Sequence, residues 1–279
     1  MGNRLLAAWT AAAACALPLA AHARADAAID VTDLRVAVTS VRPGHTAAVT
    51  FARGGGSTAE SDASSGDPPA SQVVTSSGGF AFGQCATAAA TGPAVGGSAS
   101  LVGNAFGEGA AVHTSAFADS AGPDAVGQGT VGLADGVAAA AFTLAPWTRM
   151  TITASVWASA SVTGASPLEF ADSGLSMTLS DEDGIGLQFI RISLDAFAWG
   201  QFGAAEDVET RTLSLSYENL SDGDLNGLFS GYVSSYAYTS DPVGTVPEPG
   251  AAAMLCAGLV LVAAAACRRA MKKAGESRP

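Results

Sequence analysis

Hydrophobic and polar residues alternate with a period of two along much of the middle of the chain. The alternation is clearest over residues 151–163, where aliphatic residues such as Ile152 and Val156 are separated by hydroxyl-bearing residues and Trp157. Successive side chains of a β-strand point to opposite faces of its sheet. The segment therefore predicts a strand that buries its aliphatic face and leaves Trp157 on the other one.

Similar runs recur between clusters of Gly, Asp, Ser and Pro, and no amphipathic helix of useful length occurs between residues 26 and 246. These runs occupy residues 34–38, 47–51, 175–179, 190–194, 213–217 and 232–238. Many short strands separated by turn residues favour two packed antiparallel sheets. The predicted fold class is all-β, an antiparallel β-sandwich or jelly-roll-like body with Gly/Ala/Ser-rich loops.

Residues 54–136 are unusually rich in Gly, Ala and Ser and contain neither Lys nor Arg. Two interpretations stay open, namely loops and Ala-lined strands of the same sandwich, or a partly disordered insertion. Residues 54–71 are expected to be mobile. A stacked β-roll is a further alternative, but residues 98–118 show no fixed repeat period.

The chain starts with the features of a secreted protein. Arg4 precedes an apolar run over residues 5–21, and small residues follow at Ala23 and Ala25. This order predicts a secretory signal peptide, residues 1–25, that enters the Sec translocon and is cut by signal peptidase after Ala23 or Ala25. An uncleaved membrane anchor is the alternative, and the shortness of the apolar run argues against it.

The other end of the chain has three parts in a fixed order. Pro247, Glu248 and Pro249 come first, and an almost purely apolar segment follows at residues 251–267. A basic cluster comes last and consists of Arg268, Arg269, Lys272 and Lys273. A helix over the apolar segment would span about 25 Å, slightly less than the ~30 Å core of a bilayer. Because positive charge stays in the cytoplasm, we expect a marginal transmembrane helix that holds the body, residues 26–245, outside the inner membrane.

This three-part order resembles the PEP-CTERM domain of Gram-negative bacteria over residues 246–279. The resemblance implies that an exosortase, a membrane-embedded transpeptidase-like enzyme, cuts at Pro-Glu-Pro and releases or re-attaches the body. It also implies an envelope or extracellular location and an association with exopolysaccharide and biofilm matrix. Residues 142–148 and 215–220 resemble stretches that recur in the bodies of such proteins. The basic run is longer and more interrupted than is typical, and an ordinary single-pass anchor is the alternative.

The charge of the chain limits the classes of molecule that it can bind. The formal net charge is −12, but seven of the thirteen basic residues lie in the two terminal signals. Between residues 26 and 249 the chain has 24 acidic residues against six Arg and no Lys, a net charge of −18. Nucleic acids and anionic lipid headgroups are bound through Lys and Arg. We therefore expect no nucleic-acid partner.

Motifs for catalysis are scarce in the sequence. His45 and His113 are the only histidines of the body, and Cys85 is its only cysteine. Residues 127–132 match Gly-x-Gly-x-x-Gly, but no helix pattern follows to form a nucleotide site. We therefore predict that the protein is not an enzyme. The alternatives are an exported polysaccharide-active enzyme that uses paired carboxylates, and a permanently membrane-anchored periplasmic binding module.

One short segment has the spacing of a metal site. Asp222, Asp224 and Asn226 follow the first half of a calcium loop, in which oxygen ligands alternate along the chain. The acidic residue expected at the twelfth position is missing, because Val233 stands there. The alternative is a tight hairpin turn, in which Asp, Asn and Gly are favoured for backbone reasons. No cofactor other than calcium is indicated.

Aromatic residues line the last predicted strand. Tyr232, Tyr236 and Tyr238 fall on one face of it, together with Ser234. Exposed aromatic rings can stack on sugar rings, whereas other tyrosines pack in a core or pair across strands. The sequence leaves both roles open. Its prediction is an exported, exosortase-processed, non-enzymatic envelope or matrix protein, with extracellular polysaccharide as a candidate partner.

Overall fold

Two antiparallel sheets, A and B, form the part of the chain that the computed structural model describes. The described residues are 23–51, 57–65, 70–75, 86–91, 94–105, 109–119, 124–133, 139–181 and 189–240. All of them fall within one structural unit, residues 21–241, which contains most of the predicted body. The signal helix and the transmembrane helix that the sequence predicts lie outside these residues.

Sheet A contains six strands in the order β13-β10-β1-β7-β6-β5. Their bounds are β1 Arg24–Ser40, β5 Ala86–Thr91, β6 Val95–Asn104, β7 Gly109–Asp119, β10 Thr148–Val162 and β13 Ala205–Asn219. Every neighbouring pair in this sheet runs antiparallel.

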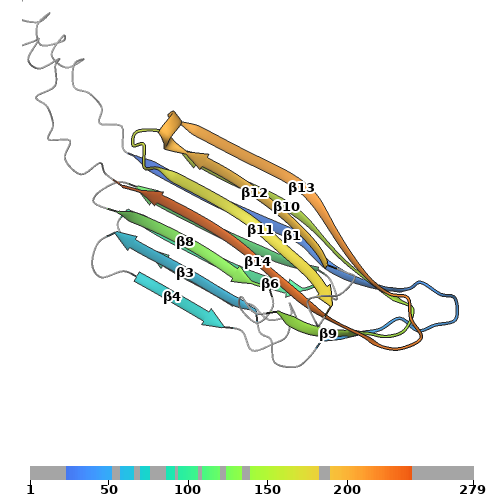
Figure 1. The fold of residues 1–279 in the computed structure, drawn as a ribbon. Coiled ribbons are helices and arrows are strands. Elements are labelled where there is room, and N and C mark those ends of the chain that lie inside the picture. Colours follow the sequence, from blue (N-terminus) through green and yellow to red (C-terminus); the bar gives the residue numbers. More distant parts are fainter. Residues whose placement is uncertain are drawn as a thin grey trace, which may run out of the picture. The chain divides into compact units, whose positions relative to one another are not determined.

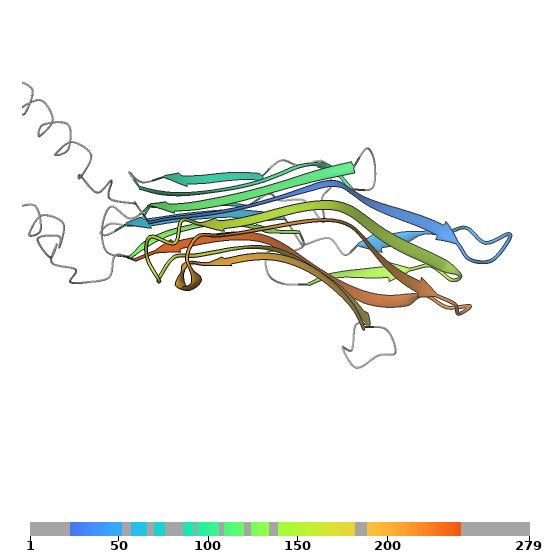
Figure 2. The same cartoon turned by 90° about the horizontal axis from the view of Figure 1, so that it is seen from above.

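Sheet B contains eight strands, with the main order β12-β11-β14-β8-β3-β4 and with β9 pairing both β14 and β2. The bounds are β2 Val49–Phe51, β3 Thr58–Ser65, β4 Ala70–Thr75, β8 Ala125–Gly132, β9 Ala140–Leu144, β11 Phe170–Asp181, β12 Phe189–Trp199 and β14 Leu225–Thr239. A short 3-10 turn, η1 (Gly200–Phe202), follows β12. Figure 1 looks onto sheet B, and Figure 2 shows the two stacked layers. The predicted β-sandwich is confirmed.

The core lies between the sheets and contains few large side chains. Strand β10 alternates as predicted, because Ile152 and Val156 are buried while Trp157 is 39% exposed. Tyr217, Phe142 and Phe229 are the largest fully buried side chains. Most of the remaining core is Ala and Val. Small core residues allow the two sheets to lie close together.

The approach of the sheets is closest where β6 faces β8. A Cβ atom on Gly97 would collide with the backbone of Gln128, and one on Gly129 would collide with the carbonyl of Ser98. The hydroxyl of Ser61 donates a 2.5 Å hydrogen bond to the carbonyl of Gly97 across this contact. Stacked sheets usually lie about 10 Å apart because side chains separate them. Glycines in both strands remove that spacer.

Strands β3 to β8 all come from the Gly/Ala/Ser-rich residues 54–136. The described part of this stretch therefore belongs to the two sheets of the sandwich. Strand β3 covers part of residues 54–71, which were expected to be mobile.

The predicted hairpin around residues 220–224 is wrong. Strand β13 belongs to sheet A and strand β14 to sheet B, so the turn between them crosses the core from one sheet to the other. Both strands have a buried face, with Leu215 in β13 and Phe229 in β14. Placing them in facing sheets lets these two faces share one core, which local turn chemistry cannot reveal.

Candidate functional site

A β-bulge interrupts β1 near the middle of sheet A. Strand β1 gains a residue between Thr32 and Arg35 relative to β10, and between Val31 and Leu34 relative to β7. Within it, Asp33 has a φ of 52°, in the left-handed region. A bulge bends its strand and redirects the neighbouring side chains, and bulges are common beside functional sites.

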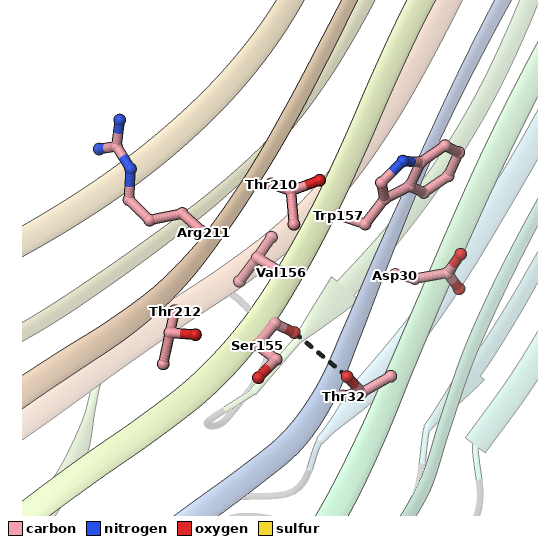
Figure 3. A pocket seen from close by; sticks show the side chains of 8 residues that line it. All are labelled: Asp30, Thr32, Ser155, Val156, Trp157, Thr210, Arg211 and Thr212. Atoms are coloured by element: carbon pink, nitrogen blue, oxygen red, sulfur yellow. Dashed lines mark hydrogen bonds between the residues drawn. The ribbon is translucent and has the colours of Figure 1, made fainter.

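A hollow of about 370 Å³ lies beside this bulge on the outer face of sheet A (Figure 3). Two rows of outward side chains cross strands β1, β10 and β13, namely Asp30, Trp157 and Thr210, and Thr32, Ser155 and Thr212. Val156 and Arg211 also line the hollow, and Figure 3 shows the guanidinium of Arg211 extending away from Trp157. The hollow therefore presents one aromatic ring among hydroxyls, and its lining includes one carboxylate and one arginine.

The first row continues onto β7, where His113 lies directly opposite Asp30. The Nδ1 atom of His113 is 2.7 Å from Oδ1 of Asp30, and both side chains are nearly half exposed. A carboxylate can accept several hydrogen bonds at once. Asp30 is thus held in place by the imidazole and keeps acceptor capacity toward the hollow.

The outer face of sheet B carries the tyrosines that the sequence singled out. Tyr232 is 45% exposed, whereas the ring of Tyr236 packs edge-on against Phe170 with centroids 5.7 Å apart. The hydroxyl of Tyr238 donates a 2.9 Å hydrogen bond to the carboxylate of Asp124. Tyr236 and Tyr238 are therefore engaged in contacts with other elements, and Tyr232 presents the most exposed ring of the three.

Two carboxylates lie near these aromatic residues. A Cβ atom on Gly174 would come within 2.5 Å of Oδ1 of Asp195, so the absence of a side chain there makes room for this carboxylate over β11. Burial, and then the negative charge of Asp195, raise the pKa of Asp172. A carboxyl group that keeps its proton more readily is what general-acid catalysis requires.

Two of the predicted calcium ligands, Asp222 and Asp224, lie in the turn between the two sheets, and the third, Asn226, is the second residue of β14. The Oδ1 atom of Asp222 accepts a 2.9 Å hydrogen bond from Trp147 Nε1 and lies 3.6 Å from a guanidinium nitrogen of Arg42. Asn226 accepts a 2.8 Å hydrogen bond from the hydroxyl of a β9 threonine, and Asp224 directly precedes β14. In the described part of the chain, no three His, Cys, Asp or Glu side chains gather as a metal site would require. Calcium binding here stays a prediction.

Only two of the predicted processing residues, Ala23 and Ala25, are among the described residues. Ala23 is buried just before β1, and Ala25 is fully buried within β1, opposite Val162 and Ala118. The two predicted cleavage positions stay predictions. Outside the described residues lie Pro247, Glu248, Pro249, Arg268, Arg269, Lys272 and Lys273.

Comparison with known proteins finds one family model that matches the chain. It is described as the PEP-CTERM protein-sorting motif and matches residues 245–269. The chain carries a PEP-CTERM sorting signal. It is therefore an exported protein that is targeted to an exosortase. No significant match was found among curated proteins or solved structures.

The PEP-CTERM match covers the Pro-Glu-Pro segment, the apolar segment and the first two basic residues of the cluster. Among the described residues, no helix is long and apolar enough to span a membrane.

Sequence reasoning placed Trp157 on an exposed face but did not find the hollow. Its residues come from β1, β10 and β13, and they form no linear motif. The one available signal was a tryptophan in a strand whose other outward residues are all Ser, Thr or Arg. That signal identifies one residue of the hollow and cannot identify its neighbours.

Proposed function

We propose that the body is a non-enzymatic polysaccharide-binding module of the cell envelope or extracellular matrix, and that the Trp157 hollow binds a neutral sugar chain. The proposal rests on the position of Trp157. An exposed indole lies directly opposite a carboxylate on one side and a hydroxyl on the other, within a surface hollow.

The chemistry of the hollow matches that of a sugar ring. A pyranose has an apolar C–H face and a rim of hydroxyls, so it can stack on the indole of Trp157 while its hydroxyls reach polar side chains. Asp30 can accept hydrogen bonds, and Thr210 can both donate and accept them. Small-ligand sites usually have volumes of about 300–1,000 Å³, and the hollow of about 370 Å³ falls in this range.

The charge of the body favours a neutral ligand. Residues 26–249 have a net charge of −18, which repels acidic polymers over distances up to about the Debye length, ~8 Å at physiological ionic strength. A neutral polymer meets no such repulsion.

The sorting signal supports the proposed location. Exosortase cleavage at Pro-Glu-Pro would remove the apolar segment and leave the body in the envelope or outside the cell. The intact mass of the mature protein tests this step, because processing removes residues 251–267. Finding these residues still attached in a strain with an active exosortase would favour the permanently anchored binding module instead.

Affinity electrophoresis of the exported protein tests the ligand proposal. Neutral polysaccharides in the gel should retard it more than acidic ones, and Trp157→Ala should weaken the apparent affinity roughly tenfold, the equivalent of about 1.4 kcal/mol. Trp157→Phe should keep part of the retardation, because it keeps a stacking ring. Leu220→Ala removes a residue that is 59% exposed and outside the hollow, so it serves as the matched control. Equal retardation of wild type and Trp157→Ala would refute the proposal.

A second candidate is an exported enzyme that cleaves polysaccharide with paired carboxylates. The observation that favours it is the raised pKa of Asp172 beside Asp195. Release of new reducing ends by the exported protein, lost in Asp172→Asn and kept in Trp157→Ala, would support the enzyme over the binding module.

A further inference from the structure

A group of apolar side chains is exposed at one end of the body. Leu168 is 47% exposed, Trp199 is 42% exposed and Phe202 is 83% exposed. Phe197, 47% exposed, and the half-buried Phe170 adjoin them. We call these five residues the base patch. Single exposed apolar residues are common, but a contiguous aromatic group usually marks an interaction surface.

The four aromatic members of the base patch form one continuous surface. The rings of Trp199 and Phe202 meet edge-to-face with centroids 6.0 Å apart. Phe170 lies directly opposite Trp199 in the register of β11 and β12, and its ring is 5.2 Å from that of Phe197. Strand β12 and turn η1 thus present their aromatic residues together rather than scattering them over the sheet.

The body's chain leaves from the same end. The hydroxyl of Ser166 donates a 2.9 Å hydrogen bond to the carbonyl of Ser240, the last described residue, and Leu168 follows two residues after Ser166. The carbonyl of Glu169 accepts a 2.9 Å hydrogen bond from the amide of Gly200, the first residue of η1. Figures 1 and 2 both show η1 at the same end as the last residues of β14.

The loop that links the chain exit to the base patch is held firmly. The carboxylate of Glu169 is completely buried and accepts hydrogen bonds of 2.7 Å from the amide of Gly164 and 2.6 Å from the amide of Ser166. Hydrogen bonds to a carboxylate are among the stronger ones in proteins. These hydrogen bonds therefore fix the position of Leu168 relative to Ser240.

The sorting signal limits how far this end can lie from the membrane. Residues 241–250 separate the last described residue from the apolar segment, and they include Pro247, Glu248 and Pro249. Ten extended residues reach at most ~35 Å. While the tail is anchored, Ser240 therefore stays within that distance of the start of the apolar segment, and η1, which carries Phe202, lies at the same end of the body as Ser240 (Figures 1 and 2).

We propose that the base patch rests on the lipid–water interface of the membrane that holds the tail, and so orients the body before exosortase cleavage. Tryptophan is enriched at membrane interfaces, and exposed Phe and Leu gain free energy on leaving water. Three carboxylates lie at this end: Asp172 lies opposite Phe197, Asp124 accepts a hydrogen bond from Tyr238, and Glu206 lies opposite Ser161 near the start of β13. These carboxylates oppose anionic headgroups, so the contact is specific for a zwitterionic surface.

Site-specific fluorescence on the full-length chain tests the proposal. The four natural cysteines are replaced by alanine, Phe202→Cys is labelled with an environment-sensitive dye, and the protein is inserted through its tail into phosphatidylcholine liposomes that carry a headgroup-level quencher. The matched control is Leu220→Cys, because Leu220 is 59% exposed. It follows the end of β13 that lies opposite Thr148, whereas η1 precedes the other end of β13, which lies opposite Val162.

The expected result is a blue shift and a loss of intensity at position 202, with neither change at position 220. Trp199→Ser combined with Leu168→Ser should reduce the quenching at position 202 without changing tail insertion, which is measured by carbonate extraction. Replacing half of the lipid by phosphatidylglycerol should also reduce it at low salt.

Three results would overturn the proposal. The first is equal quenching at positions 202 and 220 with the tail inserted, and the second is stronger quenching on anionic lipid. The third is a blue shift at position 202 that rises with the amount of protein per liposome and comes without quenching by the headgroup quencher, because that result would assign the base patch to a second copy of the chain.

Discussion

Replacing Asn219 tests whether one buried amide holds the turn between the two sheets. Its side-chain nitrogen donates hydrogen bonds to the carbonyls of Leu144 and Ala145, each at 3.1 Å, and of Gly223 at 2.7 Å. Its side-chain oxygen accepts a 3.0 Å hydrogen bond from the amide of Ser221. The residue is 1% exposed. Asn219 thus links the two segments, residues 142–148 and 215–220, that resemble recurrent stretches of PEP-CTERM protein bodies.

The cost of Asn219→Ala follows from the number of partners it leaves unpaired. A hydrogen bond contributes about 0.5–1.5 kcal/mol net, and a buried group that loses its partner costs about 1–3 kcal/mol. Two amide hydrogens shared among three carbonyls support about two full bonds, so we expect a loss of about 2–4 kcal/mol. In a domain of this size that loss lowers the melting temperature by roughly 4–16 °C. Asn219→Asp should cost more, because a carboxylate would face the carbonyls without a donor.

Urea and thermal unfolding of the exported protein measure this effect. The midpoint should fall while the denaturant dependence stays the same, since the folded surface is unchanged. Asn226→Ala is the matched control, because Asn226 is exposed and makes one side-chain hydrogen bond to Thr143, so its loss should stay within about 0.5 kcal/mol. An Asn219→Ala variant that loses no more stability than Asn226→Ala would refute the reasoning.

Three further outcomes are expected. Burial is the main cause that raises the pKa of Asp172 above its usual 3.8, so the folded protein holds this proton to a higher pH than the unfolded chain does. As the pH rises from the usual pKa of an aspartate through the raised pKa of Asp172, the free energy of unfolding therefore falls. Asp172→Asn should remove this fall, which is measured as urea midpoints from pH 4 to 7. Gly129→Ala should destabilise the body by about 1–3 kcal/mol, because its Cβ would collide with the carbonyl of Ser98, whereas Gly223→Ala, whose Cβ would meet nothing within 4 Å, should be close to neutral in the same assay. Calcium binding to residues 222–226 predicts heat of binding in a millimolar isothermal titration, and its absence would exclude the site.

Local patterns in the sequence predict those features that depend on neighbouring residues. The alternation of residues 151–163 suffices to assign the two faces of β10, because a period of two specifies which side of a strand is apolar. The sorting signal is likewise linear, since a Pro-Glu-Pro segment, an apolar run and a basic cluster act in their order along the chain. The family match at residues 245–269 confirms that signal.

Connections between distant strands could not be predicted in this way. The Asp-Gly-Asp segment at residues 222–224 favoured a hairpin, yet β13 and β14 lie in different sheets. Turn residues lower the energy of a sharp bend but do not decide whether the next strand pairs beside the last one or faces it. Burial of Leu215 and Phe229 in one shared core favours the facing arrangement.

Sequence alone therefore determined the sorting signal of this protein, its all-β class and the two faces of its clearest strand. Each of these is encoded by residues that lie close together along the chain. Tertiary structure alone decided the rest. It placed Trp157 between Asp30 and Thr210, showed that glycines in β6 and β8 remove the spacer between the sheets, and gathered the base patch around the chain exit. These features arise from strand order and register, which the whole core selects together.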